Sequence, residues 1–197
     1  MIARRFAHPD LERLRRILSD RPGVEQGELG DAVRWAAVAI LLREHAGAID
    51  LLLIKRAERD GDPWSGHVAL PGGRRDPADG SLEDTAVREV WEEVGVDVRR
   101  DGRVLGTLDD LAPRTPVLPP IAVRPFVAAV ADVPLAPNPE VAAAAWVPLD
   151  ALRAPEATRE STVLVRGERR TVPTFVVPGY LVWGMTERIL RQFVDLF

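Results

Sequence analysis

Three glutamates in the segment 88–96, Arg-Glu-Val-Trp-Glu-Glu-Val-Gly-Val, have the residue type and spacing of a metal site. Glu89, Glu92 and Glu93 are three and four residues apart, so on a helix they share one face. Clustered carboxylates repel each other unless cations neutralise them, and oxygen ligands suit hard ions such as Mg²⁺ or Mn²⁺. A merely solvated acidic face would normally carry Lys or Arg at i+4, and none follows here. The segment therefore predicts a divalent metal site.

A second chemical feature lies shortly before these glutamates, in Leu-Pro-Gly-Gly-Arg-Arg at residues 70–75. Gly72 and Gly73 permit close backbone approach, and Arg74 and Arg75 offer charged donors to phosphate. An acidic helix that binds metal beside an arginine- and glycine-rich loop is typical of a site for phosphoanhydrides. The two arginines could equally be ordinary turn residues.

Local signals indicate how these residues are positioned. Leu82, Ala86, Val90 and Val94 form an apolar stripe that predicts a helix over 81–94. Ser81 is expected to cap its start, with Asp84 at the third helical position, and Gly95 to end it. The glutamates then lie on the charged face of this helix.

Other apolar patterns predict an α/β fold around this helix. We expect a pair of adjacent strands, and Arg56, which follows the second of them, either contacts phosphate or caps the strand's solvated end. Residues 59–79 form a long irregular loop, interrupted only by an apolar run at 67–70, and such loops are often functional. The expected elements are helices at 9–19 and 181–197 and strands at 35–42, 49–54, 104–108, 121–130 and 144–147.

The composition narrows the function classes. A chain of 197 residues with 46 % hydrophobic residues predicts one domain, with residues 1–34 as an N-terminal helical extension and 35–197 as the core. The net charge of −4 disfavours nucleic acid as a partner, and the absence of cysteine excludes disulfides and a cysteine nucleophile. No apolar stretch is long enough for a membrane span, so we expect a cytoplasmic protein.

The charge is unevenly distributed along the sequence. Segment 76–97 contains eight acidic residues against Arg88 alone, a local net charge of −7. The rest of the chain therefore sums to +3, so an acidic site is set in a mildly basic protein. Bound Mg²⁺ would reduce the local charge and help to admit a polyanionic substrate.

The segment 88–96 resembles the Nudix hydrolase family. That family's motif runs glycine, five residues, glutamate, seven residues, then Arg-Glu-apolar-x-Glu-Glu-x-Gly-apolar, and residues 88–96 match every defined position of its second half. In the first half, five residues separate Gly73 from Asp79, which stands in place of the glutamate, and eight residues separate Asp79 from Arg88. Asp79 and Asp84 are both candidate partners for Arg88.

The resemblance implies a Nudix-type α/β/α sandwich with a mixed β-sheet and metal-dependent hydrolysis of a diphosphate linked to another group. It assigns Glu89, Glu92 and Glu93 as metal ligands and Arg88 as their orienting partner. The general base would be one of these glutamates or a separate carboxylate, for which Glu140 is a candidate.

Residues 71–79, Pro-Gly-Gly-Arg-Arg-Asp-Pro-Ala-Asp, further resemble the family's coenzyme A-directed subgroup, as does Trp-Gly-Met-Thr at 183–186. This implies cleavage of coenzyme A or an acyl-CoA to 3′,5′-ADP and 4′-phosphopantetheine. The alternatives are ADP-ribose, NADH, dinucleoside polyphosphates or nucleoside triphosphates as substrates, or a sensor that binds a nucleotide without cleaving it. The N-terminal segment and the C-terminal helix could serve a homodimer, which is common in the family.

Overall fold

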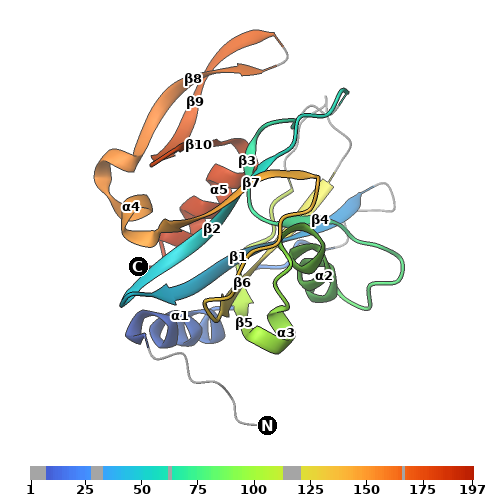
Figure 1. Ribbon diagram of the computed structural model, residues 1–197, viewed down its shortest axis with the longest axis vertical. Helices are drawn as coiled ribbons and strands as arrows, with labels where there is room; N and C mark the ends of the chain where they lie inside the picture. Colours follow the sequence, from blue (N-terminus) through green and yellow to red (C-terminus); the bar gives the residue numbers. More distant parts are fainter. Residues whose placement is uncertain (1–7, 28–32, 62–63, 113–120, 166) are drawn as a thin grey trace.

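The computed structural model describes residues 8–27, 33–61, 64–112, 121–165 and 167–197 (Figure 1). A mixed sheet of seven strands is its centre, with the order β3-β2-β1-β6-β5, while β4 pairs with β1 and β7 with β2. β1 and β6 are parallel and the other pairs are antiparallel. The strands are β1 (Arg34–His45), β2 (Ala48–Arg56), β3 (Val68–Ala69), β4 (Gly72–Arg74), β5 (Gly102–Thr107), β6 (Ile121–Val130) and β7 (Val141–Pro148).

Helices cover both faces of this sheet. Because successive side chains of a strand point to opposite faces, β1 and β2 contribute to two separate cores. Ile40 and Leu42 pack in one cluster with leucines of α1 (Pro9–Asp20), α4 (Leu149–Arg153) and α5 (Gly184–Val194). Ala39 and Leu41 pack in the other with valines of α2 (Leu82–Val94). The predicted α/β/α sandwich with a mixed sheet is confirmed.

The expected strand pair at 35–42 and 49–54 is present as the antiparallel β1 and β2. The N-terminal helix is present as α1, and Leu11, Leu14 and Leu18 are buried in the same cluster as the sheet. The helix at residues 9–20 thus precedes the sheet in the sequence and packs into the larger hydrophobic cluster on one face of that sheet. Among the described helices, none combines the length and the apolarity that a membrane span requires.

A second sheet of three strands was not predicted. It consists of β8 (Thr158–Val165), β9 (Glu168–Val177) and β10 (Tyr180–Trp183), in the order β10-β9-β8. β8 and β9 form a long hairpin that projects away from the main sheet (Figure 1). The prediction that the last helix begins at residue 181 was wrong, because Leu181 pairs with Val176 in this sheet and α5 begins at Gly184.

Two short helices and one short strand complete the described structure. β4 lies inside the stretch 59–79 that was predicted as irregular, and it pairs with the start of β1 through Ala36, Ala37 and Val38. α3 (Val98–Asp101) follows α2 closely, and a 3₁₀ turn at Pro155–Ala157 leads into β8. The strand β4 is what brings the glycine pair against α2.

Candidate active site

The ends of α2 are fixed by the residues that the sequence indicated. The Ser81 side chain accepts a hydrogen bond from the Asp84 amide at 3.1 Å, which caps the first turn. Gly95 adopts the left-handed conformation with φ 71°, and its amide donates to the Trp91 carbonyl. Residues other than glycine rarely adopt this backbone conformation, so the helix ends here.

The glycine pair of β4 lies directly against the glutamates of α2. The Gly72 amide donates to Glu93 Oε2 at 2.9 Å. A Cβ atom on Gly73 would lie only 2.3 Å from Glu89 Oε1. At Gly72, where φ is 154°, a Cβ would lie 2.4 Å from the Ala37 carbonyl oxygen. Both positions therefore need glycine so that β4 can approach β1 and α2 at the same time.

The three glutamates occupy different environments. Glu93 is 5 % exposed, the Glu89 side chain 16 % and the Glu92 side chain 51 %. Burial raises the pKa of Glu93 to about 7, and the Glu89 carboxylate adds to this, while the Gly72 amide and Arg56 act against it. Burial also raises the pKa of Glu89, opposed by Arg88. Two carboxylates are thus held where a cation would favour their charged forms.

Arg88 connects the glutamates to the preceding loop. Its Nε and Nη2 donate to Asp79 Oδ1 and Oδ2, both at 3.0 Å, and Nη2 also donates to the Arg74 carbonyl at 3.1 Å. Its Nη1 donates to Glu89 Oε1 at 2.8 Å and to Glu92 Oε2 at 2.9 Å. One guanidinium therefore holds three acidic side chains and a carbonyl group of β4 together.

Asp79, and not Asp84, is the partner of Arg88. Asp79 is buried, and its Oδ2 also accepts from the Thr85 hydroxyl at 2.8 Å and the Asp76 amide at 2.9 Å. These donors, Arg88 first, hold the pKa of Asp79 far below its usual range. Asp84 instead accepts from the Ser81 hydroxyl and pairs with Arg99. The aspartate in place of the family's glutamate therefore still reaches the arginine.

The arginines predicted to contact phosphate differ in their exposure and in the interactions that their side chains make within the protein. Arg75 Nη2 donates to the carbonyls of Asp79 and Gly80, so this side chain closes the loop before α2. Arg74 is exposed at the end of β4, opposite Ala36. Arg56 ends β2, and its charge lowers the pKa of Glu93, which places it near the glutamates. Their roles toward phosphate stay predictions.

Glu140 lies on a segment bound to the end of α2. The Asn138 amide donates to the Glu93 carbonyl at 3.0 Å, and the Ala57 amide donates to the Glu140 carbonyl at 2.8 Å. The Glu140 carboxylate accepts from Arg59 Nη2 at 3.0 Å and contributes to raising the pKa of Glu93. The fold therefore brings this sequence-distant carboxylate to the edge of the glutamate site.

The donors suit a hard divalent cation, although their present arrangement is not a complete coordination shell. Across residues that the structure describes, no three acidic or histidine side chains converge closely enough to hold a metal ion. Glu89 and Glu93 lie beside the glycine pair, while Arg88 binds Glu89 and Glu92. The chemistry of the set fits Mg²⁺ or Mn²⁺, and the ligand assignment stays a prediction.

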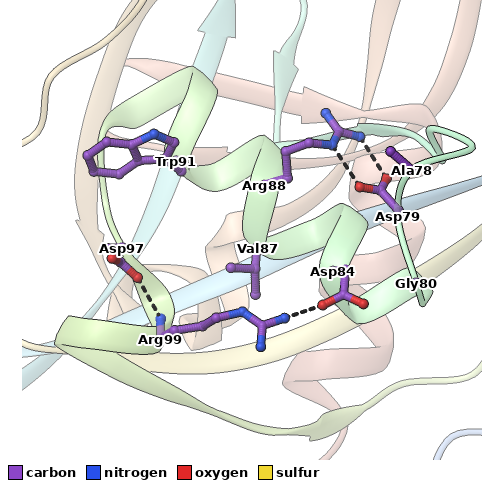
Figure 2. Close-up of a pocket in the computed structure, with 9 residues that line it drawn as sticks. All are labelled: Ala78, Asp79, Gly80, Asp84, Val87, Arg88, Trp91, Asp97 and Arg99. Atoms are coloured by element: carbon purple, nitrogen blue, oxygen red, sulfur yellow. Dashed lines mark hydrogen bonds and ion pairs between the residues drawn. The ribbon is translucent and has the colours of Figure 1, made fainter.

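A cavity of about 620 Å³ lies on another side of α2, where Asp84, Val87, Arg88 and Trp91 line it (Figure 2). Trp91 is 53 % exposed and Arg99 comes from α3. Sequence reasoning missed this cavity. An aspartate cap at Asp97, shortly after Gly95, could have indicated the short helix that carries Arg99.

Comparisons with known proteins agree with this geometry. The family model of the NUDIX domain matches residues 33–166. The chain therefore belongs to the Nudix family. A solved MutT/nudix family protein from Enterococcus faecalis has the same fold, with a TM-score of 0.57 and 18 % identity over 87 % of this chain and 63 % of that one.

Two curated relatives carry hydrolase or diphosphatase names. The uncharacterized Nudix hydrolase NudL of Cronobacter sakazakii is 33 % identical over 184 residues, which cover 87 % of this chain and 86 % of NudL. The peroxisomal coenzyme A diphosphatase ndx-8 of Caenorhabditis elegans is 37 % identical over 123 residues, 59 % of this chain and 50 % of the worm protein. The chain thus matches about half the length of the worm relative.

Proposed function

We propose that this protein hydrolyses the diphosphate linkage of a nucleoside diphosphate derivative with the help of a divalent cation. The observation that carries the proposal is that buried Glu93 and partly buried Glu89 lie against the backbone of Gly72 and Gly73. Burial raises the pKa of both glutamates even with Arg88 beside Glu89, so holding these two neighbouring carboxylates together is unfavourable until a further cation binds, which points to a functional role.

Glu89, Glu93 and Glu92 would hold the cation, which we take to be Mg²⁺ or Mn²⁺. When bound, it would screen the phosphate oxygens and lower the pKa of a water that attacks phosphorus. Glu93 is fixed by the Gly72 amide, whereas half-exposed Glu92 has room to reorient. Arg88 and Asp79 position the helix face and do not touch the substrate in this scheme.

The chain's own cations and acids would bind the substrate around these carboxylates. Arg74 and Arg56 are the candidates for phosphate contacts, and the backbone at Gly72 and Gly73 is close enough to the glutamates to contact the same phosphates. Glu140, at the edge of the site, is our candidate for a general base that is separate from the three glutamates.

Coenzyme A or an acyl-CoA is the substrate we favour, with 3′,5′-ADP as one product and 4′-phosphopantetheine, or its S-acyl form when an acyl-CoA is cleaved, as the other. The support is the resemblance of residues 71–79 and 183–186 to the coenzyme A-directed subgroup, together with the name of the worm relative. The centroid of the Trp183 ring lies 4.6 Å from that of the His67 ring. His67 lies at the start of the segment that leads to the glycine pair. A homodimer and a cytoplasmic location stay predictions.

A substrate panel tests this proposal. Purified protein is incubated with Mg²⁺ or Mn²⁺ and with coenzyme A, acetyl-CoA, ADP-ribose, NADH, diadenosine tetraphosphate or ATP, and the products are separated by chromatography. We expect the highest specificity constant for coenzyme A or acetyl-CoA. Preference for another diphosphate would reassign the substrate, and nucleotide binding without turnover at any metal concentration would favour a sensor.

A further inference from the structure

The guanidinium of Arg88 is divided between two sets of partners, and this division has a consequence for metal binding. We propose that Arg88 Nη1 serves as a built-in substitute for the divalent cation, bridging Glu89 and Glu92 until metal binding displaces it. This inference rests on the proposed function, because it concerns the same carboxylates. A role for Arg88 in orienting the glutamates does not require competition with the metal. The present inference adds that competition between the Arg88 side chain and the metal ion.

One half of the guanidinium is fixed independently of the glutamates. Nε and Nη2 bind both oxygens of Asp79, and Nη2 also binds the Arg74 carbonyl. Asp79 is itself held by the buried Thr85 hydroxyl and the Asp76 amide. Such a bidentate pair keeps its geometry when other contacts of the arginine are lost. The guanidinium can therefore remain in place while Nη1 releases its acceptors.

The other half binds the carboxylate oxygens that a cation would need. Nη1 lies 2.8 Å from Glu89 Oε1 and 2.9 Å from Glu92 Oε2, so this one nitrogen donates to two acidic side chains and bridges them. A divalent ion binds carboxylates through the same oxygen lone pairs. The Glu92 side chain is 51 % exposed and can turn toward an arriving ion. Metal binding at this place is accordingly an exchange of one cation for another.

This exchange has two effects. In the metal-free protein, the guanidinium reduces the repulsion between Glu89 and Glu92 and so helps to keep α2 intact. When metal binds, two charge-assisted hydrogen bonds must be broken, which weakens the apparent affinity for the ion. Arg88 would thus set the metal concentration at which the site fills.

The test uses a double variant, Arg88→Met with Asp79→Asn, which removes the guanidinium and its buried partner and leaves the net charge unchanged. Dissociation constants for Mg²⁺ and Mn²⁺ are measured by calorimetry on metal-free protein, without substrate. We expect the constant for the variant to fall about tenfold relative to the wild type, the size of one strong hydrogen bond. Metal added to the variant should also raise its melting temperature more than in the wild type.

The matched control is the pair Arg99→Met with Asp84→Asn, an ion pair between α3 and α2 with the same charge change. Its dissociation constant should stay within about twofold of wild type. An unchanged or higher constant in the Arg88 double variant would overturn the inference while leaving the proposed function standing. Absence of divalent-ion binding by the wild type would overturn both.

A second variant, Arg88→Lys, covers the case in which the double variant does not fold. The lysine ammonium keeps the charge, but it cannot bind Asp79 in bidentate fashion and bridge two glutamates at once. We expect a dissociation constant at least about threefold lower than in the wild type. A constant equal to or above the wild-type value would contradict the substitution of metal by Arg88.

Discussion

Two sides of helix α2 differ sharply although they belong to the same thirteen residues. On one side, buried Glu93 and partly buried Glu89 lie against the backbone of β4, and the approach is so close that glycine is required. On the other, Trp91 and Asp84 line an open cavity and Asp84 pairs with Arg99 at the surface (Figure 2). Substitutions should therefore have large effects on the first side and small effects on the second.

The strongest contrast should come from Glu93→Gln, which keeps the shape of the side chain and removes its charge. We expect turnover to fall by more than about 100-fold, because even outer partners of a metal ligand contribute 10- to 100-fold. The measurement is kcat under saturating Mg²⁺, with a thermal melt to show that the fold is retained. Trp91→Leu on the cavity side is the matched variant, and its kcat should stay within about twofold. Equal losses in both variants would remove the distinction between the two sides.

A smaller effect is expected from the backbone that faces the glutamates. In Gly73→Ala, the new methyl group would lie 2.3 Å from Glu89 Oε1, so either the carboxylate or β4 must shift. Displacement of a ligand by about 1 Å reduces kcat by roughly 10- to 100-fold. Gly80→Ala is the control, because its methyl group would meet only the flexible end of Asp84 at 3.1 Å. If both variants retain full activity, the close approach of β4 is not needed for catalysis.

The buried side should also make the stability of the metal-free protein depend on pH. The pKa of Glu93 is raised to about 7 in the folded state, so the folded protein binds a proton that the unfolded chain has already lost above pH 4.5. Stability contributed by this group is present below pH 4.5 and is lost as the pH rises toward 7, by roughly 3 kcal/mol. Urea unfolding in the presence of a chelator, compared with Glu93→Gln, measures this loss. Parallel pH profiles for the two proteins would contradict it.

The sequence predicted the elements around the site because their local signals agree with their tertiary environment. Ser81 and Gly95 mark the ends of α2, and the apolar runs of β1 and β2 are buried on both faces. The partner of Arg88 was not predictable, because Asp84 has the favourable i, i+4 spacing. Only the folded loop shows that Asp79 reaches the guanidinium while Asp84 turns to Ser81 and Arg99.

The strands β8, β9 and β10 were missed for a physical reason. Charged residues occupy both faces of the outer hairpin, among them Arg159, Glu160, Arg169 and Arg170, so no alternating apolar pattern marks it. Leu181 was assigned to the last helix because it lies four residues before Met185, a spacing that fits a helix as well as a strand end. The cavity beside Trp91 was likewise invisible, since it depends on how α3 folds back.

The carbonyl groups at the end of α2 link the helix to a distant stretch of chain. The Val94 carbonyl accepts from the Ala136 amide and the Glu93 carbonyl from the Asn138 amide, while the Glu140 carbonyl binds the end of β2 through Ala57. Segments joined in this way open together as one cooperative unit. Amide hydrogens of Ala136 and Asn138 should therefore exchange with solvent at the same rate as those in the last turn of α2. The Glu140 carboxylate should stay at the site for as long as this unit remains folded.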